Sequence, residues 1–135
     1  MSMIKVRIVT PLGVYKETNA NQITIDTTDG QRGILPNHMP LVTMLSIGKL
    51  VLIQDNSRDE YAIANGLFYF HDNVAEIMTD AIESKDEIDS ERAEQSRRRA
   101  EERLNSHNSN IDHQRAEIAL KKAINRLSIK GTIQK

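Results

Sequence analysis

The 135-residue chain contains no cysteine and no tryptophan, and aromatic residues make up only 4% of it. The absence of cysteine excludes disulfides, zinc-thiolate sites, iron–sulfur clusters and cysteine nucleophiles. The scarcity of aromatic side chains leaves little material for stacking bases or for aromatic cages. No segment approaches the roughly 18 consecutive apolar residues of a membrane-spanning helix, and the N-terminal residues alternate instead of forming the apolar core of a signal peptide. We therefore expect a cytosolic chain that contacts a membrane, if at all, only through a larger complex.

The net charge of −1 conceals two unlike parts of the chain. Residues 1–84 carry six Lys/Arg and ten Asp/Glu, whereas residues 85–135 carry twelve Lys/Arg and nine Asp/Glu. All three prolines and five of the six glycines lie in the first part, and the second part has no aromatic residue. A shift in composition this sharp predicts two domains, 1–84 and 85–135. The near-neutral total also excludes a generally basic nucleic-acid-binding protein.

The first part has the pattern of a small all-β domain. In residues 3–9 apolar and charged side chains alternate with the period of two that is typical of a half-buried strand. Turns are expected at Ser46 to Gly48 and, as the clearest hairpin signal, at Asn65-Gly66, because both residues of that pair tolerate a positive φ. Short apolar segments separated by about 8–12 residues predict a sandwich or barrel. These segments cover residues 14–17, 22–27, 41–45, 49–54, 60–64, 67–71 and 74–79.

The second part predicts two helices joined by a polar break at residues 105–110. Residues 86–104 are rich in good helix formers, and in residues 111–127 apolar side chains recur at spacings of three and four. Ser109 or Asn110 is the expected N-cap of the second helix. The facing stripes are rich in alanine, which buries about half the area of leucine or less, so we expect a weakly held and movable helical hairpin. The stripes comprise Ile88, Ala93, Ala100 and Leu104 on the first helix and Ala116, Leu120, Ala123, Ile124 and Leu127 on the second.

Three motifs resemble the epsilon subunit of bacterial F-type ATP synthases. They are Gly30-x-x-Gly33-Ile34-Leu35-Pro36-Asn37-His38-x-Pro40-Leu41, Thr10-Pro11-x-Gly13 and Ala64-Asn65-Gly66-Leu67. The resemblance implies an N-terminal β-sandwich followed by a C-terminal antiparallel α-helical hairpin. It further implies a non-catalytic subunit of the rotating central stalk, peripheral at the cytoplasmic face of the bacterial membrane. The implied partners are the gamma subunit, the ring of c subunits and, when the hairpin extends and blocks ATP hydrolysis, the alpha/beta catalytic hexamer.

The glycine- and proline-rich segment 30–41 is the strongest local signal. Its two glycines permit backbone conformations closed to other residues, and its two prolines restrict the chain between them. From the residues alone, the segment is interpreted as a rigid connection between strands. The resemblance implies that it faces the c ring and gamma, with His38 as a polar contact to the rotor.

The segment Ile88-Asp89-Ser90-Glu91-Arg92-Ala93 contains the residue types that a nucleotide site needs. An adenine requires an apolar floor with polar acceptors at its edge, and phosphates require guanidinium groups that bind bidentately. A simpler interpretation is a surface ion pair between Asp89 and Arg92, three residues apart on one helical face, worth about 0.3–0.5 kcal/mol. The residues that fit a nucleotide are Ile88, Ala93 and Asp89 for the adenine, and Arg92, Arg99 and Arg126 for the phosphates.

This segment also matches the Ile/Leu-Asp-x-x-Arg-Ala motif with which some bacterial epsilon subunits bind ATP. The resemblance implies that ATP is a regulatory ligand that favours the compact hairpin, and that Glu83 supplies a further polar contact. Lys122 stands where the family often has arginine. Lysine cannot bind phosphate bidentately, so this difference should weaken phosphate binding. No resident cofactor is implied, and the need for magnesium stays open. The predicted ATP-binding residues are Glu83, Ile88, Asp89, Arg92, Ala93, Arg99 and Arg126.

No other motif predicts chemistry. The four histidines lack metal-ligand spacing, and neither a G-x-S-x-G sequence nor a Walker-type loop occurs, so we expect no catalytic and no metal site. The basic clusters at 97–103 and 121–126 alternate with acidic residues, which favours a solvated face or attraction to an acidic protein surface over nucleic acid. Two other functions stay open: a stand-alone nucleotide-binding module with the hairpin as a lid, and an enzyme with its active site in the β domain.

Overall fold

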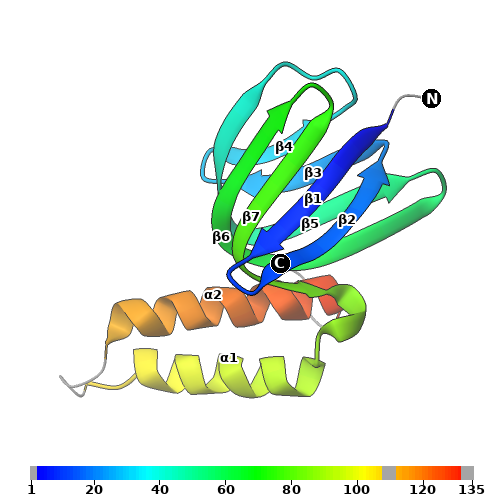
Figure 1. The fold of residues 1–135 in the computed structure, drawn as a ribbon. Helices are drawn as coiled ribbons and strands as arrows, with labels where there is room; N and C mark the ends of the chain where they lie inside the picture. The colour runs from blue at the N-terminus through cyan, green and yellow to red at the C-terminus, as the bar shows by residue number, and fades with distance from the viewer. Residues whose placement is uncertain (1–2, 108–111, 132–135) are drawn as a thin grey trace. The chain divides into compact units, whose positions relative to one another are not determined.

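The computed structural model describes residues 3–107 and 112–131 of the chain. The chain divides into two compact units, Met1–Ser84 and Lys85–Lys135. Strands form the first, called the β unit below, and helices form the second, called the helical unit (Figure 1).

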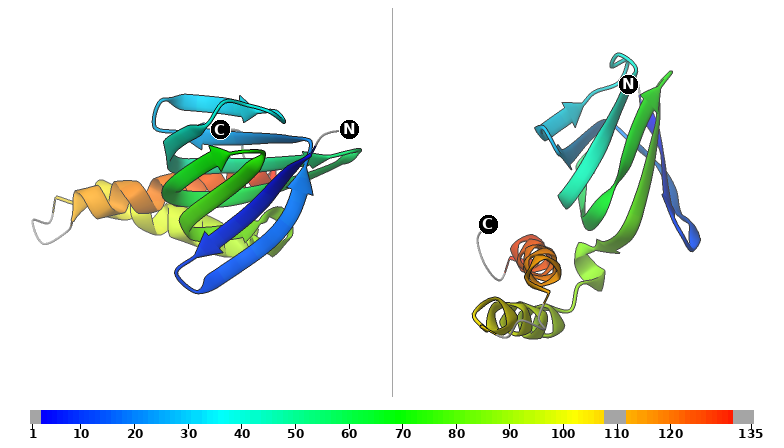
Figure 2. Two further views of the ribbon diagram at one scale, coloured as in Figure 1. Left: turned by 45° about the horizontal axis from the view of Figure 1, so that its top comes forward. Right: turned by 90° about the vertical axis from the view of Figure 1, so that its left-hand side faces the viewer.

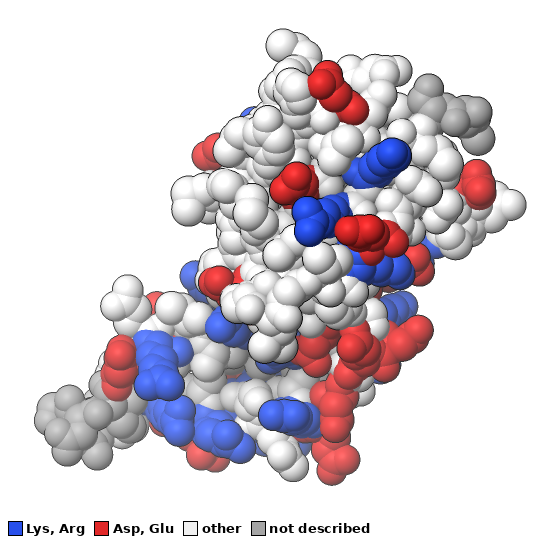
Figure 3. Space-filling view, in the orientation of Figure 1, with Lys and Arg blue, Asp and Glu red and all other residues white. Residues whose placement is uncertain are grey.

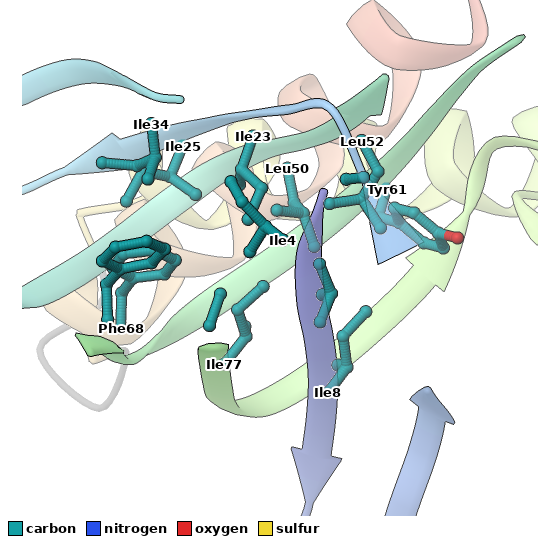
Figure 4. Close-up of a cluster of buried hydrophobic side chains, with 14 of the residues drawn as sticks. Ile4, Ile8, Ile23, Ile25, Ile34, Leu50, Leu52, Tyr61, Phe68 and Ile77 are labelled. Atoms are coloured by element: carbon teal, nitrogen blue, oxygen red, sulfur yellow. The ribbon is translucent and has the colours of Figure 1, made fainter. Parts of the chain in front are cut away.

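The β unit is built from one seven-stranded sheet in the order β2-β1-β7-β6-β5-β3-β4. Neighbouring strands are antiparallel except β1 and β7, which run parallel. The sheet curls over on itself (Figure 2), so that the side chains of Ile25 and Ile34 point toward those of Phe68 and Ile77 (Figure 4). This arrangement confirms the predicted β-sandwich. The strands are β1 (Ile4–Thr10), β2 (Gly13–Ala20), β3 (Gln22–Thr27), β4 (Gly30–Ile34), β5 (Leu41–Gln54), β6 (Ser57–His71) and β7 (Val74–Ser84).

The core of the β unit is mostly aliphatic. Along β1, Ile4, Val6 and Ile8 are buried and Lys5 and Arg7 are exposed, which confirms the predicted period of two. Phe68 and Phe70 are the only phenylalanines of the chain, and both are fully buried. Because every strand contributes buried side chains from one face, the unit has a continuous core of its own. The core comprises Ile4, Val6, Ile8, Ala20, Ile23, Ile25, Ile34, Leu45, Leu50, Leu52, Tyr61, Ile63, Phe68, Phe70, Ala75 and Ile77.

The turns predicted at Ser46 to Gly48 and at Asn65-Gly66 are wrong. Strands β5 and β6 run through both positions without turning, and Leu45 pairs with Gly66. Asn65 and Gly66 have φ values of 58° and 147°, so the signal for positive φ was correct but marks an irregularity inside a strand. A Cβ atom on Gly66 would lie 2.0 Å from the carbonyl oxygen of Met78 in β7. Glycine is needed here because two strands approach closely, not because the chain reverses.

Segment 30–41 is only partly the rigid connection that its glycines and prolines indicated. Gly30–Ile34 forms β4, the strand at one edge of the sheet, and pairs with β3. The connection proper comprises residues 35–40, called the 35–40 loop below, which leads into β5.

The helical unit is an antiparallel hairpin, as predicted (Figures 1 and 2). It comprises a short 3₁₀ turn, η1 (Lys85–Glu87), and the helices α1 (Ser90–Leu104) and α2 (His113–Lys130). The N-cap of α2 is Asp112, whose carboxylate accepts a hydrogen bond from the backbone N–H of Arg115 at 3.1 Å. The expected caps, Ser109 and Asn110, lie outside the described residues. Gly131 ends α2 in the left-handed conformation, φ 86°.

The interface between the two helices is rich in alanine, as the spacing predicted. Helix α1 buries only Ala93 and Ala100. Helix α2 buries Ala116, Ala123 and Leu127 of the predicted stripe, and also Asn125 and Ile129, which the periodicity did not single out. The two methyl groups of α1 remove little apolar area from water, so the α1 side of the interface contributes little burial, and the weak association of the helices stays a prediction.

Candidate functional site

The predicted ATP-binding residues fall into both units. Glu83 is half-buried near the end of β7 in the β unit. The other six residues belong to the helical unit, where Ile88, Asp89, Arg92 and Ala93 mark the start of α1. A common site that includes Glu83 therefore stays a prediction.

Asp89 is the N-cap of α1 and, among the described residues, forms no side-chain ion pair. Its backbone is extended, and its Oδ1 atom accepts a hydrogen bond from the backbone N–H of Arg92 at 3.2 Å. The helix begins four residues later than the predicted residue 86, and that later start turns Asp89 from a helical residue into a cap. Because the cap occupies Oδ1, the carboxylate keeps one oxygen for another donor.

The apolar and basic members of the predicted site differ in exposure. Ile88 and Ala93 are buried, whereas Arg92 and Arg99 are exposed. Across residues 3–107 and 112–131, neither guanidinium group takes part in an ion pair. Arg92 and Arg99 lie seven residues apart, so they project from one side of α1 about 10.5 Å apart along the axis. Two uncompensated cations on one side of a helix are suited to a polyanion.

The antiparallel hairpin brings the end of α2 to the start of α1. The Nζ atom of Lys130 donates a hydrogen bond to the backbone carbonyl oxygen of Lys85 in η1 at 2.9 Å. Arg126, half-buried and one turn before Lys130, therefore lies in the same half of the hairpin as Asp89 and Arg92. This half gathers most of the predicted residues, whereas Arg99 lies two turns further along α1.

A second charged group on α1 is fully compensated. Arg97 forms ion pairs with Glu94 and with Glu101, the latter at 2.5 Å from Nη1, and Arg98 also contacts Glu94. The hydrogen bond from Arg97 is the main cause that holds the pKa of Glu94 below its ordinary value and raises that of Arg97. On the visible face of the helical unit, acidic side chains gather toward the right-hand end, and basic side chains predominate along the rest with a few acidic ones beside them (Figure 3). The ion pairs of Arg97 and Arg98 stabilise α1 from within, because all these partners lie one turn apart on the same helix.

His38, the predicted rotor contact, is held within its own loop. Its Nδ1 atom lies 2.7 Å from the carbonyl oxygen of Met39, and its ring packs edge-on against Phe70 with the centroids 5.8 Å apart. The side chains that project from the loop are instead apolar: Met39 is 77% exposed and Leu35 58%. A contact between His38 and a rotor stays a prediction, and the geometry gives Leu35 and Met39 the more accessible positions.

An exposed apolar surface on the sheet was missed by the sequence analysis. Cross-strand pairing aligns Met44 with Leu67 and Leu67 with Met78, so that these side chains form a row across β5, β6 and β7. Alternate residues of these strands point to opposite faces of the sheet, and in these segments the residues of both faces are largely apolar. The sequence pattern therefore did not reveal that one face is exposed to water. We call this surface the outer apolar face; its members are Val42, Met44, Leu67, Tyr69 and Met78, exposed between 36% and 62%.

Neither described helix is both long and apolar enough to cross a membrane. Within residues 3–107 and 112–131, no three His, Cys, Asp or Glu side chains are grouped so as to hold a metal ion.

Comparison with known protein families accounts for nearly the whole chain. The family model of the ATP synthase delta/epsilon chain matches residues 3–85 with its beta-sandwich domain and residues 86–131 with its long alpha-helix domain. The chain belongs to the delta/epsilon chain family of ATP synthases. This result confirms the resemblance to epsilon subunits that the three motifs indicated.

Individual relatives agree with the family assignment. The ATP synthase epsilon chain of Ligilactobacillus salivarius is 39% identical over 132 residues, which cover 95% of each chain. That of Bacillus velezensis is 37% identical and covers 97% of this chain and 99% of the relative. That of Desulforamulus reducens is 42% identical over 120 residues and covers 89% and 91%. The epsilon chain is a non-catalytic subunit of ATP synthase, so the chain is not itself an enzyme.

Solved structures of ATP synthases contain the same fold. A chain in the mitochondrial ATP synthase of Euglena gracilis, determined as the OSCP/F1/c-ring assembly, matches with a TM-score of 0.83 at 25% identity. The match covers 93% of this chain and 79% of that one. A chain from the central stalk and c-ring of the Tetrahymena thermophila enzyme matches with a TM-score of 0.58 at 19% identity, and this likeness shows the fold alone.

Proposed function

We propose that this chain is a central-stalk subunit of a bacterial proton-translocating F-type ATP synthase. In this proposal the β unit, residues 1–84, docks on the gamma subunit and the c-subunit ring. The helical unit, residues 85–135, extends toward the alpha/beta hexamer and inhibits ATP hydrolysis. The protein would lie peripherally at the cytoplasmic face of the membrane and contact the membrane only through the complex. The match to a chain of an F1/c-ring assembly supports this placement.

The proposed regulatory role rests on the small apolar interface between α1 and α2. Helix α1 contributes only two buried side chains, both alanine, so separating the helices exposes little apolar area. Each helix nevertheless has its own N-cap, and α1 has its internal ion pairs. Both helices can therefore stay helical when they part, which is what a change between compact and extended states requires.

The outer apolar face supports docking by the β unit. The exposed apolar side chains of this face are surrounded by polar residues of the strands. Apolar patches with a polar rim are typical of protein–protein contact sites. Leu35 and Met39 of the 35–40 loop provide a second exposed apolar contact. Both surfaces are formed by the β unit alone, so rotor binding should not depend on the state of the hairpin.

ATP is the proposed regulatory ligand of the helical unit. The guanidinium groups of Arg92 and Arg99, which form no ion pair within the described parts of the chain, supply positive charge for the phosphates. Arg126 lies in the same half of the hairpin as Arg92. Contacts from both helices to one ATP molecule would favour the compact, non-inhibitory state. A preference of a few kcal/mol suffices to shift a two-state population from mostly extended to mostly compact.

Reconstitution tests the regulatory function. The full chain, added to a complex of gamma with the alpha/beta hexamer, should inhibit ATP hydrolysis. A chain ending at Ser84 keeps the entire core of the β unit and should bind gamma without inhibiting. Full inhibition by the shortened chain would exclude the hairpin as the inhibitory element. Tight ATP binding by a full chain that does not bind gamma would instead favour a stand-alone nucleotide-binding module.

Titration calorimetry, with and without magnesium, tests the ATP site. Arg92→Ala should weaken ATP binding at least tenfold, because it removes a charged hydrogen-bond donor from the phosphates. Arg103→Ala removes an equally exposed arginine from the last turn of the same helix and should leave binding unchanged. Equal losses in the two variants would indicate general attraction by positive charge instead of a site.

A further inference from the structure

The 35–40 loop is joined to the turn between β6 and β7 by two hydrogen bonds between asparagines. The backbone N–H of Asn37 donates to Oδ1 of Asn73 at 2.5 Å. In return, Nδ2 of Asn73 donates to Oδ1 of Asn37 at 2.8 Å. The two residues lie 36 positions apart in the sequence, so the contact exists only in the folded β unit.

Asn73 is itself firmly placed. It follows Asp72 in a two-residue turn in which φ is 51° and then 60°, the conformation of a type I′ hairpin that fits the twist of the flanking strands. Its carbonyl oxygen accepts a hydrogen bond from the backbone N–H of Lys5 in β1 at 2.9 Å. The turn joins β6 to β7 and is also hydrogen-bonded to β1. Asn73 therefore offers the loop a rigid point of attachment.

The loop is fixed to the rest of the β unit by the two asparagine hydrogen bonds and by the packing of the His38 ring against Phe70. Asn37 has a positive φ of 68°. The backbone N–H of His38 donates a hydrogen bond to the carbonyl oxygen of Leu35 at 3.2 Å. Of all side chains beyond the loop in the described parts of the chain, only that of Asn73 hydrogen-bonds to residues 36–39. Leu35 and Met39, two residues before and two residues after Asn37, carry exposed apolar side chains.

We propose that Asn73 is a positioning residue for rotor binding, acting through Asn37. This inference rests on the proposed docking of the β unit to gamma and the c ring. The paired hydrogen bonds hold the 35–40 loop in one conformation before contact, so Leu35 and Met39 are already presented to the partner. Ordering a loop during binding costs affinity, and a loop that is ordered beforehand avoids that cost.

Asn73→Gly is the direct test, because glycine accepts the positive φ of this position while removing both hydrogen bonds. Binding is measured to ATP synthase from which this subunit has been removed. We expect the variant to bind about tenfold more weakly than the unaltered chain. Amide hydrogen exchange at His38, whose backbone N–H is bonded to the carbonyl oxygen of Leu35 within the loop, should be faster in the variant, which reports the freed loop independently of rotor binding.

Asn21→Ala is the matched control. Oδ1 of Asn21 accepts a hydrogen bond from the backbone N–H of Asp55 at 2.6 Å, which is the same kind of bond to a tight turn, at the opposite end of β6. The control should lower the stability of the β unit by a similar amount and leave rotor affinity unchanged. Equal losses of rotor affinity in Asn21→Ala and Asn73→Gly would overturn the positioning role, because stability alone would then explain both.

A rescue experiment separates positioning from folding. In the Asn37→Gly background, Asn73→Asp still offers an acceptor to the backbone N–H of residue 37. The background substitution has already removed Oδ1 of Asn37, which the second carboxylate oxygen of the aspartate would otherwise meet. This double variant should bind the rotor more tightly than the one that combines Asn37→Gly with Asn73→Gly. Equal binding of the two double variants would refute the inference. Failure of the unaltered chain to bind at all would instead refute the proposed docking itself.

Discussion

The carboxylate of Asp89 accepts a hydrogen bond from the backbone N–H of Arg92, and the guanidinium group of the same arginine is left exposed to solvent. The aspartate thus fixes where α1 begins, while the arginine side chain stays available for a ligand. A surface ion pair between the two, which their spacing suggested, would have neutralised that arginine. The short motif that contains both residues therefore combines a structural part and a binding part.

Replacing Asp89 should separate these two parts. Asp89→Ala is expected to destabilise the helical unit by about 1 kcal/mol, because the N–H of Arg92 loses its acceptor, whereas Asp89→Ser keeps the cap. If the free oxygen of Asp89 contacts adenine, Asp89→Ser should retain the thermal stability measured by circular dichroism and still bind ATP more weakly. Asp112→Ala removes the corresponding cap of α2 and should affect stability alone. An unchanged ATP affinity in Asp89→Ser would restrict Asp89 to capping.

The hydrogen bond from Lys130 to the carbonyl oxygen of Lys85 should help to close the hairpin. Lys130→Met removes the donor but keeps an unbranched side chain, so we expect faster hydrogen exchange at the ends of both helices, by about two- to fivefold. Lys121→Met, at an exposed position of α2, is the control and should exchange like the unaltered chain. If the two variants exchange equally fast, the bond does not restrain the hairpin.

The spacing of short apolar segments predicted a sandwich or barrel, and the helical spacings of residues 86–127 predicted the hairpin, because both patterns are local. The choice of the sandwich came from the resemblance to epsilon subunits. The turn at Asn65-Gly66 was predicted wrongly for a physical reason. Asn and Gly indicate a backbone that can adopt a positive φ, which is also typical of a turn. Here glycine is required because the carbonyl group of Met78 in β7 approaches Gly66 too closely for a side chain. A neighbouring strand of this kind is invisible in a local pattern.

The candidate site was predictable in its residue types and not in its contacts. Shifting the start of α1 by four residues was enough to convert Asp89 from an ion-pairing residue into a cap. The pair Asn37 and Asn73 could not be found at all, because only the fold brings residues 36 positions apart together. Both cases show that the unpredicted contacts are tertiary or depend on exact helix boundaries.

Acidification should weaken α1 through Glu94. Hydrogen bonding from Arg97 lowers the pKa of Glu94 below its ordinary value of 4.5, so the native state binds this proton less readily than the unfolded state. The resulting stabilisation is fully present above pH 4.5 and is lost as the pH falls through the lowered pKa. Thermal unfolding followed by circular dichroism from neutral pH downward should therefore show a loss of stability that Glu94→Gln reduces. Glu102→Gln, an exposed carboxylate on the same helix, should leave the pH dependence unchanged.

Gly66→Ala should be among the most damaging single substitutions in the β unit. The new Cβ atom would meet the Met78 carbonyl oxygen at 2.0 Å, in addition to the strain of a side chain at φ 147°, and we expect a loss of more than about 4 kcal/mol. Gly30→Ala is the matched control, because φ is 117° there but nothing lies within 4 Å of the added carbon, so only the backbone strain of about 1–3 kcal/mol applies. Urea unfolding of the two variants measures the difference. Equal losses would mean that β7 does not approach Gly66 this closely, and the continuous path of β6 past that glycine would have to be abandoned.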